Sequence, residues 1–274
     1  MPKYSIVTCV SDFDIYNSCL LASLRHNHKN IEYELIPIDN RSNGYTASSA
    51  LNLGVSIAKS KLIICCHQDV TILPDFFNHL EANLKKLTRK KWGILGSAGR
   101  LLKLDAVSIH GLDVGVVYDG PPANYNEDYQ NNLKTSWEGI KTLNKVYSVD
   151  ECLFIMNKVD DIAYDEDLNG FHFYGTDICL NYRRSNYDVY ATYLPIIHHG
   201  VYSSSLQTNH SYWPLFKRLV NKWLPIYDRC FGTHMHWRRL SDDLVELVSY
   251  ITTDSISLNF QAKVLYSNVT EYKK

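Results

Sequence analysis

The chain has 274 residues and a formal net charge of −1, and 45% of its residues are hydrophobic and 21% are charged. The length suits one large domain or one domain with an extension, and the composition is that of an ordinary globular protein. The balanced charge argues against nucleic acid as a partner, and no apolar run of the sequence approaches the ~20 residues that cross a membrane.

The cysteines and the N-terminus indicate where the protein works. The chain has seven cysteines, and Cys65 and Cys66 are adjacent within an apolar run, which does not suit a framework of disulfide bonds. The first ten residues contain a short apolar run, unlike the longer hydrophobic region of a signal peptide. We therefore expect reduced thiols and a cytoplasmic protein, which could work at the inner face of the membrane.

Short apolar strands alternate with helical segments through the first hundred residues. Runs of apolar and β-branched residues predict strands at 4–10, 33–39, 61–66 and 92–99. Helical spacing of apolar residues predicts helices at 14–27, 46–58 and 73–87. This alternation is typical of an α/β protein with a mostly parallel sheet that helices cover on both faces.

The middle of the chain is less regular. Residues 119–132 are rich in turn formers and predict a mobile loop. We expect one or two strands within 145–157, a helix at 173–187 and a strand at 189–197 that ends at His198 and His199.

The C-terminal part has two segments with apolar residues at helical spacing. The first predicts a helix at 212–224, and the second, with Leu240, Leu244, Val248 and Ile251, predicts a helix at 240–251. We therefore expect a catalytic or binding domain at 1–203 and a mainly helical C-terminal extension at 204–274.

Polar side chains follow three consecutive strands of the predicted sheet. They are Ser11-Asp12, Asp39-Asn40 and His67-Gln68-Asp69. Parallel α/β sheets bind ligands outside the carboxyl ends of their strands, so we expect these residues to meet in one crevice.

Asp69 is the best candidate ligand of a divalent cation, which in turn would hold a diphosphate. His198 or His199, also just past a strand, could supply a second ligand. A carboxylate with an imidazole and phosphate oxygens suits Mn²⁺ somewhat better than Mg²⁺. Alternatively, Asp69 could cap the following helix, where Pro74 marks a start, and the histidines could be structural.

Several stretches resemble one enzyme family. "SIVTCVSDFDIYNSCLLASL", "IPIDNRSNGYTASSALNLGVSIAKSK" and "LIICCHQDV" are similar to the nucleotide-binding half of family 2 glycosyltransferases with the GT-A fold. His67-Gln68-Asp69-Val70 matches the motif that replaces Asp-x-Asp in a subgroup related to a streptomycin-biosynthesis protein. "WGILGSAG", "YDEDLNGFHFYGTDICLNYRRSNYDVY" and "LPIIHHG" resemble the next strand, the acceptor-side motif and the closing histidine of that subgroup, so the resemblance covers residues 4–203.

The resemblance implies an inverting, metal-dependent transferase with a nucleoside-diphosphate sugar as donor, UDP being the leading nucleotide. It assigns to the nucleotide sugar the residues Thr8, Val10, Asp12, Asp39, Asn40, Asn52, His67, Gln68 and Asp150. Asp69 and His198 would hold the metal, with His199 as the alternative to His198. The acceptor would be a saccharide or a lipid-linked saccharide, in the synthesis of a surface polysaccharide or glycan.

The resemblance also implies that Asp177 is the catalytic base. A carboxylate in hydrogen-bond reach of the acceptor hydroxyl can take its proton during attack on the anomeric carbon. Two departures from the family pattern weaken this assignment and the metal site: Thr176 stands where Glu is common, and His67 replaces the first Asp of Asp-x-Asp. Asp165 and Glu166 are rival acids nearby.

Two other functions remain open at this stage. The departures at Thr176 and His67 allow a non-catalytic GT-A-like protein that binds nucleotide sugars or acts as a scaffold in a polysaccharide assembly complex. A nucleotidyltransferase is disfavoured, because the first strand is not followed by a glycine-rich loop with basic residues to bind a nucleoside triphosphate.

The predicted helix at 212–224 carries basic residues beside its apolar stripe. Between residues 212 and 239 there are six Lys or Arg residues and one acid. The helix could lie on an anionic membrane with Trp213 and Trp223, or it could pack on the catalytic domain or on another subunit of a homo-oligomer.

Overall fold

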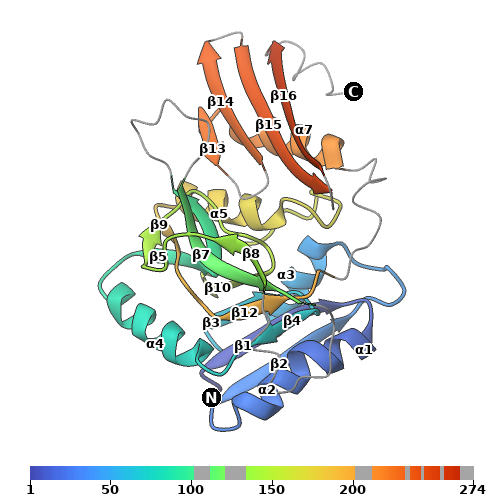
Figure 1. Cartoon of the computed structure of the whole chain (residues 1–274), viewed down its shortest axis with the longest axis vertical. Helices are drawn as coiled ribbons and strands as arrows, with labels where there is room; N and C mark the ends of the chain where they lie inside the picture. Colours follow the sequence, from blue (N-terminus) through green and yellow to red (C-terminus); the bar gives the residue numbers. More distant parts are fainter. Residues whose placement is uncertain are drawn as a thin grey trace.

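The computed structural model describes residues 1–101, 112–120, 134–200, 212–231, 235–241, 244–253 and 256–265. The predicted loop at 119–132 lies mostly outside the described residues, as does the expected domain boundary at 203. Figure 1 shows the N-terminal sheet and its helices in the lower part of the view and the C-terminal strands above them.

The central sheet has seven strands. Their order is β2 (Tyr33–Asp39), β1 (Tyr4–Val10), β3 (Leu62–Cys66), β10 (Leu153–Asn157), β5 (Trp92–Gly96), β11 (Asp188–Ala191) and β9 (Asn144–Lys145). All except β10 and β9 run in the same direction, because β10 is antiparallel to both β3 and β5 and β9 is antiparallel to β11. The predicted α/β fold with a mostly parallel sheet is confirmed.

Helices cover both faces of this sheet (Figure 1). They are α1 (Phe13–Tyr16), the π-helix η1 (Asn17–Leu21), α2 (Ala22–Asn27), α3 (Ala47–Ile57), α4 (Phe76–Leu87) and α5 (Tyr174–Arg184). Alternate residues of a strand point to opposite faces, so Ile6 of β1 packs with α1, η1, α2 and α4, while Val7 packs with α3 and α5. The predicted helix at 14–27 is therefore present, with a π-helical turn in its middle.

A second sheet lies beside the first. It consists of β4 (Val70–Ile72), β12 (Ile196–His198), β7 (Leu112–Asp119) and β6 (Ala98–Leu101), and β8 (Lys134–Glu138) pairs with β7. Two predicted strands are corrected here. Residues 92–99 divide between β5 and β6, and 189–197 divide between β11 and β12 around Pro195, which has no N–H to donate to a ladder.

The C-terminal part is one helix and a four-stranded antiparallel sheet. Helix α7 (Tyr212–Trp223) precedes β13 (Arg229–Phe231), β14 (Met235–Ser241), β15 (Leu244–Thr253) and β16 (Ile256–Leu265), which pair in chain order. The prediction of a helix at 240–251 and of a mainly helical extension is wrong. A spacing of four residues fits a strand as well as a helix, and the β-branched residues of this segment favour the strand.

The C-terminal unit is packed on α5. Leu180 of α5 shares a buried apolar cluster with Phe216 and Trp223 of α7 and with Trp237 of β14. The apolar stripe of α7 therefore faces protein, and Trp223 is only 1% exposed. This supports the packing alternative for the helix over the membrane alternative; the side chain of Trp213 lies outside the described part. Among the described helices, none has the length and apolar character to cross a bilayer.

Candidate active site

The ends of β1, β2 and β3 meet at one edge of the central sheet. Asp39 is opposite Val10 in the parallel ladder of β1 and β2. The Gln68 side-chain oxygen accepts hydrogen bonds from the backbone N–H groups of Ser11 and Asp12, both at 2.9 Å. Gln68 therefore ties the turn after β3 to the turn after β1, and the predicted convergence of these strand ends is observed.

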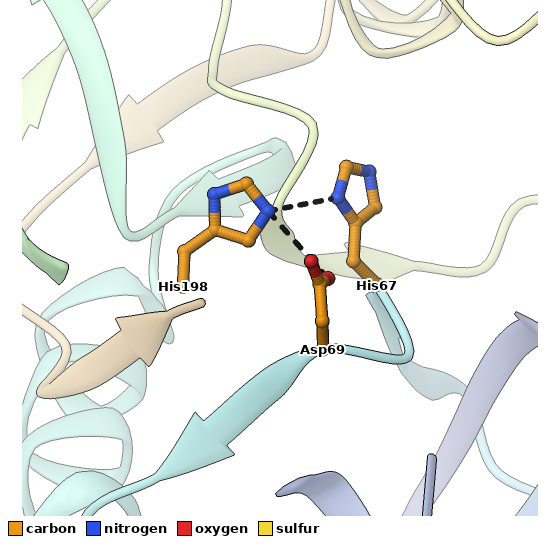
Figure 2. A group of neighbouring side chains, drawn as sticks. All are labelled: His67, Asp69 and His198. Atoms are coloured by element: carbon orange, nitrogen blue, oxygen red, sulfur yellow. Dashed lines mark hydrogen bonds and ion pairs between the residues drawn. The ribbon is translucent and has the colours of Figure 1, made fainter. Parts of the chain in front are cut away.

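His67, Asp69 and His198 form a cluster at this edge (Figure 2). His67 and Asp69 lie in the turn between β3 and β4, and His198 ends β12, which is antiparallel to β4. Nε2 of His198 is 3.6 Å from Oδ1 of Asp69 and 3.3 Å from Nδ1 of His67. One ligand atom from each residue lies within 4.8 Å of the others, so the three could bind one cation together.

The protonation of the two imidazoles differs. Burial lowers the pKa of His67, and the neighbouring His198 lowers it further. Burial also lowers the pKa of His198, but the Asp69 carboxylate outweighs this effect and the net shift is upward. The Asp69 carboxylate therefore favours the protonated form of His198. His67 stays neutral, as a metal ligand must be.

The donor set fits a transition-metal cation. Two imidazoles and one carboxylate are a softer set than the oxygens that hold Mg²⁺ or Ca²⁺, and they suit Mn²⁺ or a neighbouring divalent metal. Three protein ligands leave positions for oxygens of a bound molecule. His67, which we assigned only to the nucleotide sugar, is a further candidate ligand that the sequence reasoning did not place in the metal group.

The contacts of Asp69 and His199 bear on the alternatives that the sequence left open. The N-cap residue of α4 is Asp75, so Asp69 does not cap that helix. The imidazole of His199 bonds Thr71 Oγ1 and the Gly120 carbonyl oxygen, both at 2.8 Å. His199 therefore holds β4 and β7 together, while His198 faces Asp69.

The cluster lies at a pocket of about 610 Å³. The pocket is lined by Cys9, Ser11, Asp12, Ile15, Asn43, Ala47, Leu51, Cys65, Cys66, His67, Gln68, Asp69, Glu151, Phe171 and Tyr174. Its acidic side chains are Asp12, Asp69 and Glu151, of which Glu151 has a pKa raised to about 8 by burial and is largely protonated at pH 7, and its described lining contains no Lys or Arg. An anionic ligand would meet a negative surface here unless a metal ion supplied positive charge.

Of the residues predicted to contact a nucleotide sugar, Asp12, His67 and Gln68 line the pocket, as does the predicted metal ligand Asp69. Elsewhere the structure places the predicted residues in structural contacts. Thr8 and Val10 are buried in β1. Asp39 pairs with Arg41, which lowers the pKa of Asp39 to about 2.

Three further predicted residues hold turns together. The Asn40 amide bonds the backbone N–H and carbonyl of Tyr45, at 2.9 and 3.0 Å. The Asn52 amide does the same for Tyr164, which links α3 to the segment before α5. Asp150 accepts a hydrogen bond from the Cys152 N–H, and its charge adds to the rise in the pKa of His198 and partly offsets the lowering of the pKa of His67.

Asp177, the predicted base, lies in the first turn of α5 and is 1% exposed. Its Oδ1 accepts hydrogen bonds from Lys222 Nζ at 2.7 Å and Trp223 Nε1 at 2.6 Å, both from α7. Its Oδ2 is buried without a hydrogen-bond partner. Burial raises the pKa of Asp177 in spite of these donors. The carboxylate is not among the pocket-lining groups.

Two pocket residues escaped the sequence reasoning as site residues. Glu151 accepts a hydrogen bond from the Gly175 N–H at 2.9 Å, and burial raises its pKa to about 8. The Tyr174 hydroxyl is 2.8 Å from Nε2 of His67. The only signal for them was position: Glu151 follows Asp150, and Tyr174 ends the Phe-His-Phe-Tyr stretch.

Comparison with known proteins found a matching family, a sequence relative and similar solved structures. Residues 5–213 match a family described as "Glycosyltransferase like family". A protein of Fuscovulum blasticum, "ATP synthase subunits region ORF 6", is 26% identical over 203 residues, which are 72% of this chain and 75% of that protein. A structure of GalNAc-T7 with UDP, GalNAc and Mn²⁺ matches 83% of this chain with a TM-score of 0.52 and 10% identity.

A structure of residues 1–349 of S. aureus TarS matches 82% of this chain with a TM-score of 0.44 and 8% identity. The matched regions cover 66% of that TarS chain and 49% of the GalNAc-T7 chain. The chain thus spans about half the length of GalNAc-T7, and at 10% identity that likeness shows the fold alone.

Proposed function

Because the chain belongs to this glycosyltransferase-like family, we propose that it transfers a sugar from a nucleoside-diphosphate sugar, with UDP as the nucleotide, to a hydroxyl group of a saccharide or lipid-linked saccharide. The observation that carries the proposal is the cluster of His67, Asp69 and His198 at the pocket between the strand ends. We also propose that the chain belongs to the subgroup with the His-Gln-Asp-Val motif. We propose that it works in the synthesis of a surface polysaccharide or glycan.

The charge of the pocket supports a donor that binds together with a metal. A diphosphate carries negative charge, and the described lining offers three acidic side chains, of which Glu151 is largely protonated at pH 7, and no Lys or Arg. Two imidazoles and Asp69 could hold Mn²⁺, which when bound would neutralise charge on the diphosphate and on the leaving group. The structure of GalNAc-T7 holds UDP and Mn²⁺ within the same fold, which favours these two ligands for the first tests.

The residues around the cluster would perform the remaining tasks. Gln68 fixes the turns at the ends of β1 and β3, so the groups that face the donor are held in place before it binds. The proposed reaction is a single displacement with inversion, in which a carboxylate accepts the proton of the acceptor hydroxyl. Asp177 is the proposed base, and it can act only after its carboxylate is released from Lys222 and Trp223.

A non-catalytic, nucleotide-sugar-binding or scaffold protein is the second candidate. One observation favours it: the carboxylate of Asp177 is buried and bonded to two side chains of α7. The replacement Asp177→Asn separates the two functions when it is assayed by release of UDP from UDP-sugars with saccharide acceptors. A catalytic base predicts a loss of turnover with donor affinity retained, while turnover equal to that of the wild type would refute the role of Asp177.

The first experiment is thermal unfolding of the protein with UDP, GDP, dTDP and CMP, each with and without MnCl₂. We expect one nucleotide to raise the Tm only when Mn²⁺ is present. The variant Asp69→Ala should lose this increase, and the matched variant Asp161→Ala, which removes an exposed carboxylate outside the pocket, should keep it. An equal increase with and without Mn²⁺ would contradict the metal-bridged donor.

A further inference from the structure

The Tyr174 hydroxyl is placed between the metal cluster and the backbone. It lies 2.8 Å from Nε2 of His67 and 3.5 Å from the carbonyl oxygen of Glu151. The side chain is buried, and it comes from the first residue of α5, far in sequence from His67. The opposite nitrogen of His67, Nδ1, faces Nε2 of His198.

The protons of this chain of contacts can be assigned from its ends. A carbonyl oxygen only accepts. While the Tyr174 hydroxyl donates to Glu151, it can only accept from the Nε2–H group of His67. A neutral imidazole with its proton on Nε2 has its lone pair on Nδ1, on the side of Asp69 and His198. That is the tautomer that a cation in the cluster requires, because a ligating nitrogen must be unprotonated.

We propose that Tyr174 is a positioning residue of the metal site: it selects the tautomer of His67 that directs Nδ1 toward the cation and fixes the plane of the ring. The proposal rests on the metal site proposed above. Groups that bond the far nitrogen of a ligating histidine commonly change metal affinity by 10- to 100-fold when they are removed.

The backbone around Tyr174 is held from both sides. Phe173, its N-terminal neighbour, has a φ of 67°, a left-handed conformation that is rare for a residue with a side chain. The ring of Phe173 packs against Tyr212 at 4.8 Å and Phe216 at 5.6 Å between centroids, both on α7. The C-terminal unit thus supports the turn that aims Tyr174 at His67.

The next residue fixes the other side. The Gly175 N–H donates to Oε1 of Glu151 at 2.9 Å. A Cβ atom at position 175 would come within 2.6 Å of Cγ of Glu151, so a glycine is needed for this close approach. Between Phe173 and Gly175, Tyr174 has little freedom to move away from the histidine.

Tyr164 provides a matched control for the loss of the hydroxyl group. It is also buried, its ring centroid is 6.3 Å from that of Tyr174, and its hydroxyl donates to Sγ of Cys65 at 3.2 Å. Its hydroxyl bonds the buried thiol of Cys65 rather than the cluster of His67, Asp69 and His198. The replacements Tyr174→Phe and Tyr164→Phe therefore remove the same group from similar surroundings, and only the first touches the proposed metal site.

The test is calorimetric titration of the whole chain with MnCl₂, alone and with UDP present, for the wild type, both variants and His67→Ala. We expect Tyr174→Phe to weaken Mn²⁺ binding by 10- to 100-fold and Tyr164→Phe to change it by less than about twofold. Thermal unfolding without metal shows whether each variant is folded.

A second readout separates positioning from a merely structural role. In protein with ¹⁵N-labelled histidine, the ring nitrogen shifts report which nitrogen carries the proton, and His67→Ala identifies the signals of His67. We expect the Nε2–H tautomer in the wild type and in Tyr164→Phe, and a mixture of tautomers in Tyr174→Phe.

Two outcomes would overturn the inference, and they differ from each other. If Tyr174→Phe binds Mn²⁺ like the wild type and keeps the tautomer, Tyr174 has no positioning role and the metal site stands. If the wild type itself binds no Mn²⁺ with or without UDP, the proposed metal site fails, and the role of Tyr174 fails with it.

Discussion

Asp69 and Asp177 are both nearly inaccessible, with 9% and 1% of their surface exposed, and their surroundings are opposite. Asp69 lies beside two imidazoles at a pocket whose described lining holds no Lys or Arg. Asp177 has Lys222 and Trp223 against one oxygen. The comparison teaches that burial alone does not define a reactive carboxylate: Asp177 is paired with a Lys and a Trp side chain, whereas Asp69 faces two imidazoles with which it could bind a cation.

The largest effect on stability should come from removing the charged partner of Asp177. The replacement Lys222→Met leaves a buried carboxylate without its charged partner, and such losses cost about 3–5 kcal/mol when both groups are buried. Because 31% of the Lys222 side chain is exposed, we expect a decrease of about 2–3 kcal/mol in the free energy of unfolding. Urea denaturation measures it.

The exposed Lys85 of α4 supplies the control. The replacement Lys85→Met should change the free energy of unfolding by less than about 0.5 kcal/mol. If the two variants were equally stable, Lys222 would not be the partner that compensates the charge of Asp177.

The next effect concerns Asp69 and the pH dependence of metal binding. The pKa of His198 is raised by Asp69, and the proton on His198 must leave before the cation binds. Below that pKa, we expect the Mn²⁺ affinity to fall about tenfold for each pH unit, since one proton competes with the metal. Calorimetric titrations between pH 5.5 and 8.5 test this, and an affinity that does not change over this range would contradict it.

A smaller effect is expected at Glu151, which lines the same pocket as Asp69. Burial raises its folded-state pKa to about 8, above the ordinary value of about 4.3 in an unfolded chain. The folded state therefore binds its proton more tightly, and this contribution to stability is complete below pH ~4 and is lost as the pH rises through 8. The glutamine side chain of the variant Glu151→Gln does not titrate, so the stability of the variant lacks this pH dependence.

We expect Glu151→Gln to be more stable than the wild type at pH 9 by at least about 1 kcal/mol, with a smaller difference or none at pH 4.5. Denaturation at the two pH values measures the difference. A gain of the same size at both pH values would mean that the effect of the substitution does not come from the titration of Glu151.

The smallest effect should come from Arg218, another basic residue of α7, which pairs with Asp167. Its contact with Asp167 is 3.0 Å long, but both side chains are more than half exposed. Exposed pairs contribute little, so Arg218→Ala should lower the free energy of unfolding by at most about 0.5 kcal/mol. A loss as large as that of Lys222→Met would show that α7 is held by its surface charges rather than by the Asp177 contact.

The sequence predicted those site residues that follow a strand directly. Asp12, Gln68 and Asp69 meet because parallel strands end at one edge, a rule that needs no long-range information. The residues that it missed come from distant segments: Tyr174 reaches His67 over 107 positions, and Glu151 faces the pocket from the turn before β10. No local pattern reports such contacts.

Contacts that the sequence does not report also decide other features. The nucleotide-binding role of Asn40, after β2, and of Asn52, on α3, stays a prediction, and in the structure their amides bond the backbone of Tyr45 and Tyr164. The segment at 240–251 fits two periodicities, and pairing with β14 and β16 decides between them. In each case the structure depends on a contact partner that the sequence pattern does not identify.

The missing positive charge of the described pocket lining has one more consequence. If the diphosphate of the donor depends on the cation for its charge compensation, the two ligands are thermodynamically linked. The metal must then raise nucleotide affinity by the same factor by which the nucleotide raises metal affinity. The protein would behave as a coincidence detector that stays nearly empty when either component is scarce.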